Sequence, residues 1–241
     1  PGTDPTGRSD PLLTLEVRRA NRPRMPIRAR KTLLLDLDGT LVDPAAGIIG
    51  CYRHALSELG VAIPEDQDLR WVIGPPMRQT FAGLLSGRAD PEIAVQLYRQ
   101  RYAEWGLYQA EVYQGVEWAL DEHERRGTRL ILCTAKPRVF ALRVVEYFGL
   151  SSHLAAVYGP ELDGRFDDKG DLIEHLLKIE RLDPADACMV GDRKHDVVAA
   201  ARHAIPTIGV LWGYGGREEL TDAGAALIIE SPDELLPPSF P

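Results

Sequence analysis

The sequence predicts an α/β fold in which a Rossmann-like, doubly wound parallel sheet carries an inserted helical cap. From Lys31 onward, short apolar runs alternate with helical patterns, as expected for a chain that winds between strands and helices. The runs are apolar at nearly every position, which is typical of strands buried on both faces of a parallel sheet. One segment, residues 45–114, breaks the alternation, because it contains helical patterns and no convincing strand.

Apolar runs and helical patterns give the elements of the core. Two of the helical patterns end at a glycine, the residue that most easily adopts the left-handed conformation that closes a helix. The expected strands are Thr32–Leu35, Arg129–Cys133, Ala155–Tyr158, Ala187–Val190, Thr207–Leu211 and, later, Ala226–Ile229. The expected core helices are Val116–Arg126 before Gly127, Pro137–Phe148 before Gly149, and Asp171–Glu180.

The interrupting segment is expected to form a cap domain of helices, because it is too long for a simple crossover between strands. Gly60 ends its first helix, and Asp90 and Pro91 begin another, since an acid caps a helix and proline fits its first turn. The expected apolar faces hold Ile49, Tyr52, Ala55, Leu56 and Leu59 in one helix and Ile93, Leu97 and Tyr102 in the other. The predicted division is a core of residues 31–44 and 115–241, a cap of residues 45–114, and hinges near Pro44 and Gln114-Gly115.

Composition indicates a globular protein that stays in the cytoplasm. Of the 241 residues, 44% are apolar and 27% are charged, and no apolar run approaches the length of a membrane span or a secretory signal. Three cysteines, Cys51, Cys133 and Cys188, lack metal-binding spacing and are expected to be buried thiols in a reducing compartment. The histidines are scattered without ligand spacing, which argues against a zinc site.

Charge is unevenly distributed along the chain. Residues 1–31 hold eight Lys/Arg and three Asp/Glu, a net charge of +5, so the remainder carries −13 of the total of −8. An acidic body argues against nucleic-acid binding. The basic, proline-rich residues 1–30 are expected to be a poorly ordered arm or an addition to the natural chain, with Met25 as a possible initiator.

Polar residues follow three of the predicted strands at the point where each strand ends. Asp36 and Asp38 follow the first strand, Thr134 follows the second, and Asp192 follows the run that ends at Val190. Because ligands of open parallel sheets bind outside the carboxyl ends of the strands, these side chains are expected to meet at one edge.

The acids at this edge indicate a magnesium site. Four carboxylates would repel one another, and a divalent cation with oxygen ligands, usually Mg²⁺, offsets that repulsion. Since Asp192 and Asp196 are four residues apart, a helix that begins there would present both on one face. The four expected acids are Asp36, Asp38, Asp192 and Asp196.

Other residues of the same edge are suited to a phosphoryl group. Gly39 and Thr40 allow a sharp turn whose N–H groups are expected to point inward, where they can cradle phosphate oxygens. Thr134 adds a hydroxyl and Lys169 adds a cation. With such a set, one carboxylate can attack phosphorus to form an aspartyl-phosphate, and a second can protonate the leaving oxygen and then deprotonate water. A cap that closes over the edge would exclude bulk water.

These motifs resemble the haloacid dehalogenase-like superfamily, and within it the phosphoglycolate-phosphatase-like branch. Four family motifs occur in the family's order. They are DxDGT at Asp36–Thr40, a Ser/Thr after a strand at Thr134 in LCTAKP, a lysine that opens a helix at Lys169 in DDKGDLIEHL, and GDxxxD from Gly191 to Asp196. The resemblance covers roughly residues 31–236 and implies the same fold, a helical cap and a Mg²⁺ cofactor.

The resemblance also implies a role for each matching residue. Asp36 is expected to be the nucleophile and a metal ligand, and Asp38 the general acid/base, with its main-chain carbonyl on the metal. Asp192 is expected to complete Mg²⁺ binding, with support from Asp196. The expected phosphate-binding residues are Thr134, Lys169, Gly39 and Ala135.

The implied activity is Mg²⁺-dependent hydrolysis of a small phosphate monoester through an aspartyl-phosphate, with phosphoglycolate as the first candidate substrate. The alternative is a 5′-nucleotidase, because ELDGRFDDK, GDRKHD, GVLWGYGGREEL and Gly74-Pro75-Pro76 resemble a subgroup that carries both names. Asp38 argues against a dehalogenase, and the lack of lysine in residues 44–114 argues against a phosphonate hydrolase. A sugar-phosphate mutase and an inactive binding protein remain open. The expected partner is a small phosphorylated metabolite, without nucleic acid or membrane, and the chain is expected to be a monomer or homodimer.

Overall fold

A six-stranded parallel sheet forms the centre of the computed structural model, which describes residues 27–75 and 77–236. The strand order is β5-β4-β1-β6-β7-β8, so the chain starts in the middle and winds first to one side and then to the other. The doubly wound α/β fold predicted from the sequence is confirmed, and the strand ends differ by at most one residue. The strands are β1 (Thr32–Leu35), β4 (Arg129–Cys133), β5 (Ala156–Tyr158), β6 (Ala187–Gly191), β7 (Thr207–Val210) and β8 (Leu227–Ile229).

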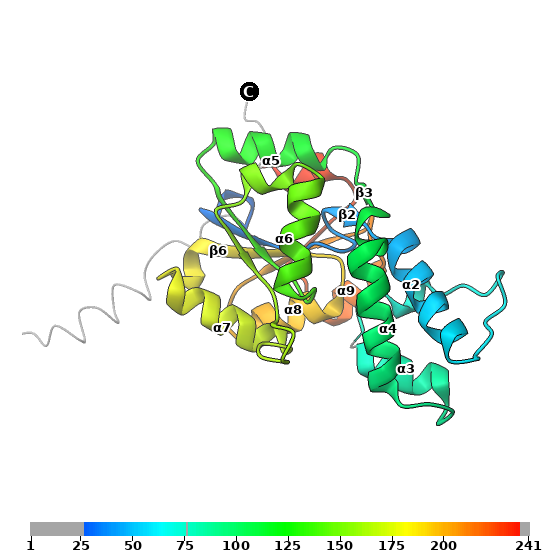
Figure 1. The fold of residues 1–241 in the computed structure, drawn as a ribbon. Helices are drawn as coiled ribbons and strands as arrows, with labels where there is room; N and C mark the ends of the chain where they lie inside the picture. The colour runs from blue at the N-terminus through cyan, green and yellow to red at the C-terminus, as the bar shows by residue number, and fades with distance from the viewer. Residues whose placement is uncertain (1–26, 76, 237–241) are drawn as a thin grey trace, which may run out of the picture.

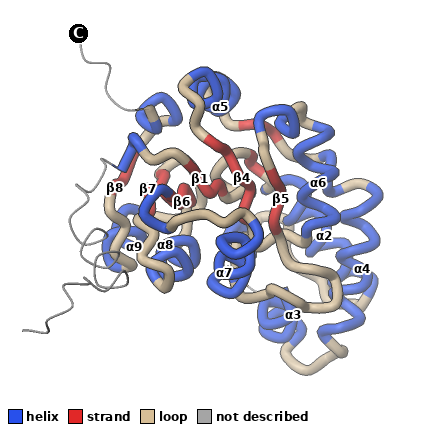
Figure 2. Tube along the Cα trace, turned by 90° about the vertical axis from the view of Figure 1, so that its left-hand side faces the viewer, coloured by secondary structure: helices blue, strands red, loops and turns tan. Residues whose placement is uncertain are grey.

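Helices cover both faces of the sheet, as Figure 2 shows with α5 on one side and α7, α8 and α9 on the other. Because successive side chains of a strand point to opposite faces, Leu33 and Leu35 pack on the side of α5 and α6, whereas Leu34 packs on the side of α7 and α8. Burial on both sides explains the continuous apolar runs. The helices are α5 (Val116–Arg125), α6 (Arg138–Tyr147), α7 (Lys169–Ile179), α8 (Lys194–Ala201) and α9 (Arg217–Asp222).

Six short 3-10 helices lie in the described parts of the core and of residues 45–114. They are η1 (Ile27–Ala29), η2 (Arg70–Val72), η3 (Gly106–Tyr108), η4 (Leu150–His153), η5 (Pro184–Asp186) and η6 (Pro232–Leu235). No helix formed by the described residues has both the length and the apolar character needed to cross a membrane. Residues 1–26, which hold most of the predicted basic arm, lie outside the described part of the chain.

Three helices lie together beside the sheet in Figure 1 and belong to the segment of residues 45–114, which we call the cap. Within the helix that Asp90 and Pro91 begin, as predicted, Asp90 accepts a hydrogen bond from the Glu92 N–H. The predicted apolar face is wrong at Ile93, which is 47% exposed, because the buried face of this helix runs through Ala94, Val95, Tyr98 and Tyr102. The helices are α2 (Ala45–Glu58), α3 (Met77–Leu85) and α4 (Pro91–Glu104).

The connections between the cap and the rest of the chain, the core, form a small antiparallel ribbon. β2 (Val42–Asp43) pairs with β3 (Glu111–Val112), with Val42 opposite Val112. The expectation of a cap segment without strands is therefore wrong at its last residues. A strand of two residues is too short to show an alternating pattern in the sequence. The two strands pair because the two connections between cap and core run side by side. The ribbon adjoins the predicted hinges and therefore supports the division into cap and core. That division remains a prediction.

Aromatic rings join the cap to the core. Tyr98 and Tyr102 stack with ring centroids 5.7 Å apart, and Tyr102 meets Phe140 of the core helix α6 edge to face at 5.4 Å. Tyr52 and Phe81 extend the same cluster within the cap at 4.5 Å. Such pairs contribute roughly 0.5–1.5 kcal/mol each beyond the apolar area that they bury. Packing therefore holds α4 against the core helix α6.

The three cysteines are buried and unpaired, as the sequence predicts. Burial raises the pKa of Cys133 and Cys188 to about 12. The pKa of Cys51 is raised to about 12 for the same reason. These thiols are therefore protonated near neutral pH and serve as small core residues.

We expect acid to destabilise the fold partly through His123 on α5. This side chain is only 2% exposed, and burial lowers its pKa below the ordinary value of about 6.5. The unfolded chain therefore binds a proton at this histidine more readily than the folded chain does. The stability that this difference contributes is fully present above about pH 6.5 and is lost as the pH falls through the lowered pKa. The free energy of unfolding changes by at most about 1.4 kcal/mol per pH unit. Urea unfolding across this range should show a shallower acid slope for His123→Gln. An unchanged slope, equal to that of the control His54→Gln, would contradict the prediction.

Candidate active site

Three buried carboxylates meet at the carboxyl ends of the central strands. Asp36 follows β1, and its N–H donates to the Val190 carbonyl of β6 over 2.9 Å. Asp192 follows β6, and Asp196 lies in the first turn of α8. Carboxylate oxygens of these three acids lie within 4.8 Å of one another. The sheet thus brings together side chains that are far apart in the sequence, at the edge that the sequence predicts.

Lys169, the first residue of α7, supplies positive charge to this cluster. Its Nζ lies 2.9 Å from Asp36 Oδ1 and also donates a hydrogen bond to Asp196 Oδ1. Burial alone would lower the pKa of Lys169, but the charges of Asp196 and Asp36 outweigh that effect and raise it. The lysine is therefore a permanent cation between two acids.

One carboxylate oxygen of Asp192 accepts a hydrogen bond, and the other has no hydrogen-bond partner among the described residues. Its Oδ2 accepts a hydrogen bond of 2.7 Å from the Tyr214 N–H, whereas its fully buried Oδ1 has no hydrogen-bond partner among the described residues. Burial, reinforced by the charges of Asp196 and Asp36, raises the pKa of Asp192 well above its usual range. A buried carboxylate oxygen without a donor, facing two more acids, is the ligand set that a hard divalent cation prefers. The residues present therefore fit Mg²⁺.

Asp196 reaches the cluster by a route that differs from the prediction. α8 begins at Lys194, so Asp192 precedes the helix and the two acids do not share a helical face. Asp196 Oδ2 instead accepts from the Arg193 N–H over 3.1 Å, which caps its own helix, while Oδ1 faces Lys169. Burial raises the pKa of Asp196, although the charge of Lys169 opposes the change.

Gly39 has a structural role that the sequence did not predict. Its N–H donates to the Val42 carbonyl over 2.8 Å and the Thr40 N–H to the Leu37 carbonyl over 3.2 Å, so neither is free for a phosphate, contrary to expectation. Gly39 has a φ of +80°, and a Cβ there would overlap with the Asp192 carboxylate. The N–H groups of Asp38 and Ala135, by contrast, have no hydrogen-bond partner within the described residues. Ala135 is exposed toward the site.

Lys136 is a site residue that sequence reasoning missed. Its Nζ donates to Asp38 Oδ1 over 2.6 Å and to the Tyr102 hydroxyl of the cap over 2.6 Å. Its main-chain N–H donates to Thr134 Oγ1 over 3.2 Å. Burial raises the pKa of Asp38, and the charge of Lys136 opposes that effect. The only signal in the sequence is a lysine two residues after Thr134.

Arg193 connects the cap to the candidate catalytic edge, the edge of the sheet where Asp36, Asp192 and Asp196 meet. Its Nη1 donates to the Ile73 carbonyl of the cap over 2.7 Å, and its Nε donates to Glu219 of α9 over 2.9 Å. Gly74 leaves room for this contact, because a Cβ there would come within 2.8 Å of Arg193 Nη1. Arg193 therefore ties the cap to the core.

A cavity of about 740 Å³ separates the cap from the catalytic edge. All predicted site residues except Gly39 and Thr40 line it. Arg78 lines it as well but is half exposed and paired with Glu92, as a surface arginine would be. Tyr214 flanks the cavity, whereas Trp212 supports the loop below it by donating to the Thr40 carbonyl. The apolar and aromatic lining from the cap includes Tyr52, Val72, Met77, Val95, Tyr98 and Tyr102.

Comparison with known proteins decides the family. The model of the family described as haloacid dehalogenase-like hydrolase matches residues 33–210 of the chain. The chain belongs to the haloacid dehalogenase-like hydrolase family. The match includes every residue assigned above to the catalytic edge.

Similar members of the family include enzymes with different names. A 5′-nucleotidase of Pseudomonas aeruginosa is 41% identical over 191 residues, which are 78% of this chain and 86% of that one. A phosphoglycolate phosphatase of Cupriavidus necator is 30% identical, over 84% of this chain and 90% of that one. The crystal structure of a predicted phosphatase from Clostridium acetobutylicum superposes with a TM-score of 0.80 at 34% identity, over 86% of this chain and 96% of that one. The predicted family, fold and phosphatase class are thereby confirmed.

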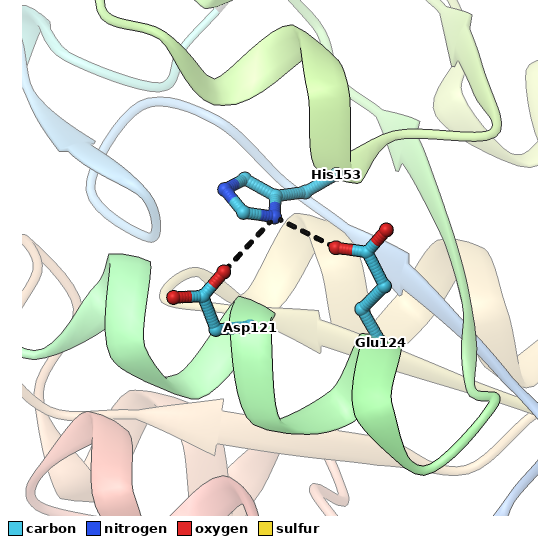
Figure 3. A group of neighbouring side chains, drawn as sticks. All are labelled: Asp121, Glu124 and His153. Carbon is cyan, nitrogen blue, oxygen red and sulfur yellow. Dashed lines mark hydrogen bonds and ion pairs between the residues drawn. The ribbon is translucent and has the colours of Figure 1, made fainter.

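A second group of possible metal ligands lies away from the family's catalytic edge. Figure 3 shows Asp121 and Glu124 of α5 pointing toward His153. His153 Nδ1 lies 3.2 Å from Glu124 Oε2 and 3.6 Å from Asp121 Oδ1. Because α5 leads into the amino end of β4 and η4 into that of β5, the group lies at the opposite edge of the sheet. Both acids are exposed, and the three side chains are explained as polar contacts at the surface.

We expect Gly39→Ala to impair the catalytic edge of this family member. The new Cβ would overlap with Asp192, and a φ of +80° is unfavourable for alanine. Hydrolysis should fall by about 10-fold or more, since displacements near 1 Å cost about 100-fold, and stability should fall by about 1–3 kcal/mol. The matched control is Gly83→Ala in α3, where a Cβ meets only open space. Activity assays and urea unfolding check this, and equal behaviour of the two variants would contradict it.

Proposed function

We propose that the protein is a Mg²⁺-dependent phosphatase that hydrolyses nucleoside 5′-monophosphates through an aspartyl-phosphate. The size and lining of the cavity are the observation that carries this proposal. Its volume of about 740 Å³, with aromatic and apolar side chains from the cap, is in the range of pockets that bind drug-sized ligands. A two-carbon acid such as phosphoglycolate would leave most of that space unfilled. The similarity to a 5′-nucleotidase supports the same substrate class. Phosphoglycolate, the first candidate from the sequence, becomes the competing substrate.

The proposed first step forms a bond between a carboxylate oxygen of Asp36 and phosphorus, while the bond from phosphorus to the leaving oxygen breaks. Asp38 gives its proton to that leaving oxygen. Both residues line the cavity. In the second step Asp38 takes a proton from water and the water oxygen bonds to phosphorus, while the bond between phosphorus and the Asp36 oxygen breaks. Asp36 is thereby regenerated as a carboxylate, and inorganic phosphate leaves.

The other residues of the edge hold charge and position the phosphoryl group. Asp36, Asp192, Asp196 and the main-chain carbonyl of Asp38 would hold Mg²⁺, which supplies neutralisation of the carboxylates and of the phosphoryl oxygens. Lys169, Thr134 and the free N–H of Ala135 are the proposed phosphate contacts. These groups are already in place around the buried edge, so they stabilise charge without reorganisation during the reaction.

The test is a panel of phosphate esters assayed with and without Mg²⁺. We expect kcat/KM for at least one nucleoside 5′-monophosphate to exceed that for phosphoglycolate by about 10-fold or more, a difference of about 1.4 kcal/mol. Added EDTA should abolish turnover. A higher value for phosphoglycolate would transfer the assignment to that substrate. No hydrolysis of any ester with Mg²⁺ present would refute the proposal as a whole.

A further inference from the structure

Two buried lysines divide the acids of the site between them. Lys169 faces Asp36 and Asp196, whereas Lys136 faces Asp38 alone among the acids. The side chain of Lys136 is 5% exposed, and both of its Nζ partners, Asp38 and Tyr102, are side chains at the cavity. Burying an ammonium group is unfavourable by several kcal/mol, and a hydrophobic residue of similar size would often be at least as stable. The position of Lys136 therefore calls for a reason other than stability.

The contact leaves one oxygen of Asp38 available. Lys136 binds Oδ1, and no other hydrogen bond to this carboxyl group occurs within the described residues. The free Oδ2 belongs to a residue that lines the cavity, where the leaving oxygen of a substrate would lie. A hydrogen bond to one oxygen restricts the orientation of a carboxyl group, and a restricted orientation favours transfer of a proton to one particular atom.

The second partner of Lys136 comes from the cap. Tyr102 lies on α4, stacked on Tyr98 and packed against Phe140 of the core. Its hydroxyl can meet the Lys136 ammonium only while α4 lies against the core. The Arg193 contact to Ile73 joins cap and core at a separate point. The orientation of Asp38 is thus linked, through Lys136, to the contact between α4 and the core.

We propose that Tyr102 and Lys136 are positioning residues that orient Asp38 for proton transfer to the leaving oxygen, so that this transfer depends on contact between α4 and the core. The inference rests on the proposed phosphatase function. It concerns only the step in which the bond between phosphorus and the leaving oxygen breaks and the Asp38 proton moves to that oxygen. A leaving group that is stable as an anion needs no such proton.

The experiment compares leaving groups in a series of substituted phenyl phosphates, from p-nitrophenyl phosphate to phenyl phosphate. The readout is kcat/KM, which reports the steps up to loss of the leaving group. Tyr102→Phe removes one hydroxyl and keeps the ring stack. It should lower kcat/KM for phenyl phosphate by roughly 5- to 10-fold, the effect of one hydrogen bond, and change that for p-nitrophenyl phosphate by less than about 2-fold.

In Lys136→Met, the loss in kcat/KM should depend on the leaving group more strongly than in Tyr102→Phe. We expect a loss of about 100-fold or more for phenyl phosphate, the usual range for general acid catalysis, and a much smaller loss for p-nitrophenyl phosphate. Adding Tyr102→Phe to Lys136→Met should cause little further loss, because both residues act through the same carboxyl group. The plot of log kcat/KM against the pKa of the leaving group should therefore be steeper in each variant than in the wild type.

The matched control is Tyr108→Phe. Tyr108 also accepts a hydrogen bond from a core cation across the cap boundary, from Arg143 over 2.9 Å, but it does not line the cavity. This variant should keep the wild-type slope. Equal losses for all leaving groups in Tyr102→Phe, or no loss at all, would overturn the inference while leaving the phosphatase proposal intact. A wild-type protein that hydrolyses no ester would refute both, and Tyr102→Phe decides the matter if Lys136→Met fails to fold.

Discussion

Asp36→Asn should lose turnover by a factor of about 10⁴ or more, with the fold intact. Removal of an essential nucleophile from a hydrolase has effects up to about 10⁶. Asparagine has the same shape as aspartate, and the change removes one negative charge from a cluster in which Asp36, Asp192 and Asp196 repel one another. Steady-state assays with Mg²⁺, together with a thermal unfolding curve, measure both parts of the prediction. Acid-quenched wild-type protein should also carry a phosphoryl group that the variant lacks.

The control for this variant is Asp121→Asn on α5, at the opposite edge of the sheet, which should keep full activity. Retained hydrolysis in Asp36→Asn would refute the nucleophile assignment. An inactive variant that still acquires a phosphoryl group would move the nucleophile to another residue. Loss of folding would show instead that Asp36 is needed to pair with Lys169.

Lys169→Met should destabilise the metal-free protein by about 3–5 kcal/mol and abolish turnover. Removing one partner of a buried ion pair leaves uncompensated charge, and here Asp36 and Asp196 would both lose their cation. Because Mg²⁺ would bind the same acids, its addition should restore part of the stability of the variant. Urea unfolding in EDTA and in Mg²⁺ measures the two effects separately.

Lys178→Met, on the same helix, is the matched control for Lys169→Met. Lys178 is exposed and pairs with Glu174 one turn away, so its replacement should leave stability and turnover unchanged. A stable, metal-insensitive Lys169→Met variant would contradict the view that repulsion among the acids is the main electrostatic problem of this site.

Residues next to strands could be predicted from the sequence, because the topology determines where they lie. Once β1, β4 and β6 are identified as neighbouring parallel strands, Asp36, Thr134 and Asp192 must meet at one edge. The roles assigned to these residues remain predictions that the experiments above test.

Contacts made between the cap and the core could not be predicted in the same way. Lys136 follows Thr134 in a loop, where most lysines are solvated, and its partner Tyr102 lies in the cap helix α4, 34 residues earlier. The conformation of the local turn decides that the Asp38 N–H is free and the Gly39 N–H is hydrogen-bonded. A glycine in the sequence does not specify that conformation. Three-dimensional packing decides these details, and one sequence does not encode them in a readable pattern.

The pairing of β2 with β3 bears on how such enzymes diversify. The chain leaves and re-enters the core through adjacent strands, which lie about 4.8 Å apart in any sheet. The entropy of closing a loop rises only slowly with its length, so the intervening segment can change in size at little thermodynamic expense. A differently built insert could therefore be grafted between Asp43 and Glu111. Exchange of this module would change the lining of the cavity while the acids that follow β1 and β6 stay in place, and a new insert would have to replace contacts that the cap supplies, such as the Tyr102 hydroxyl on Lys136.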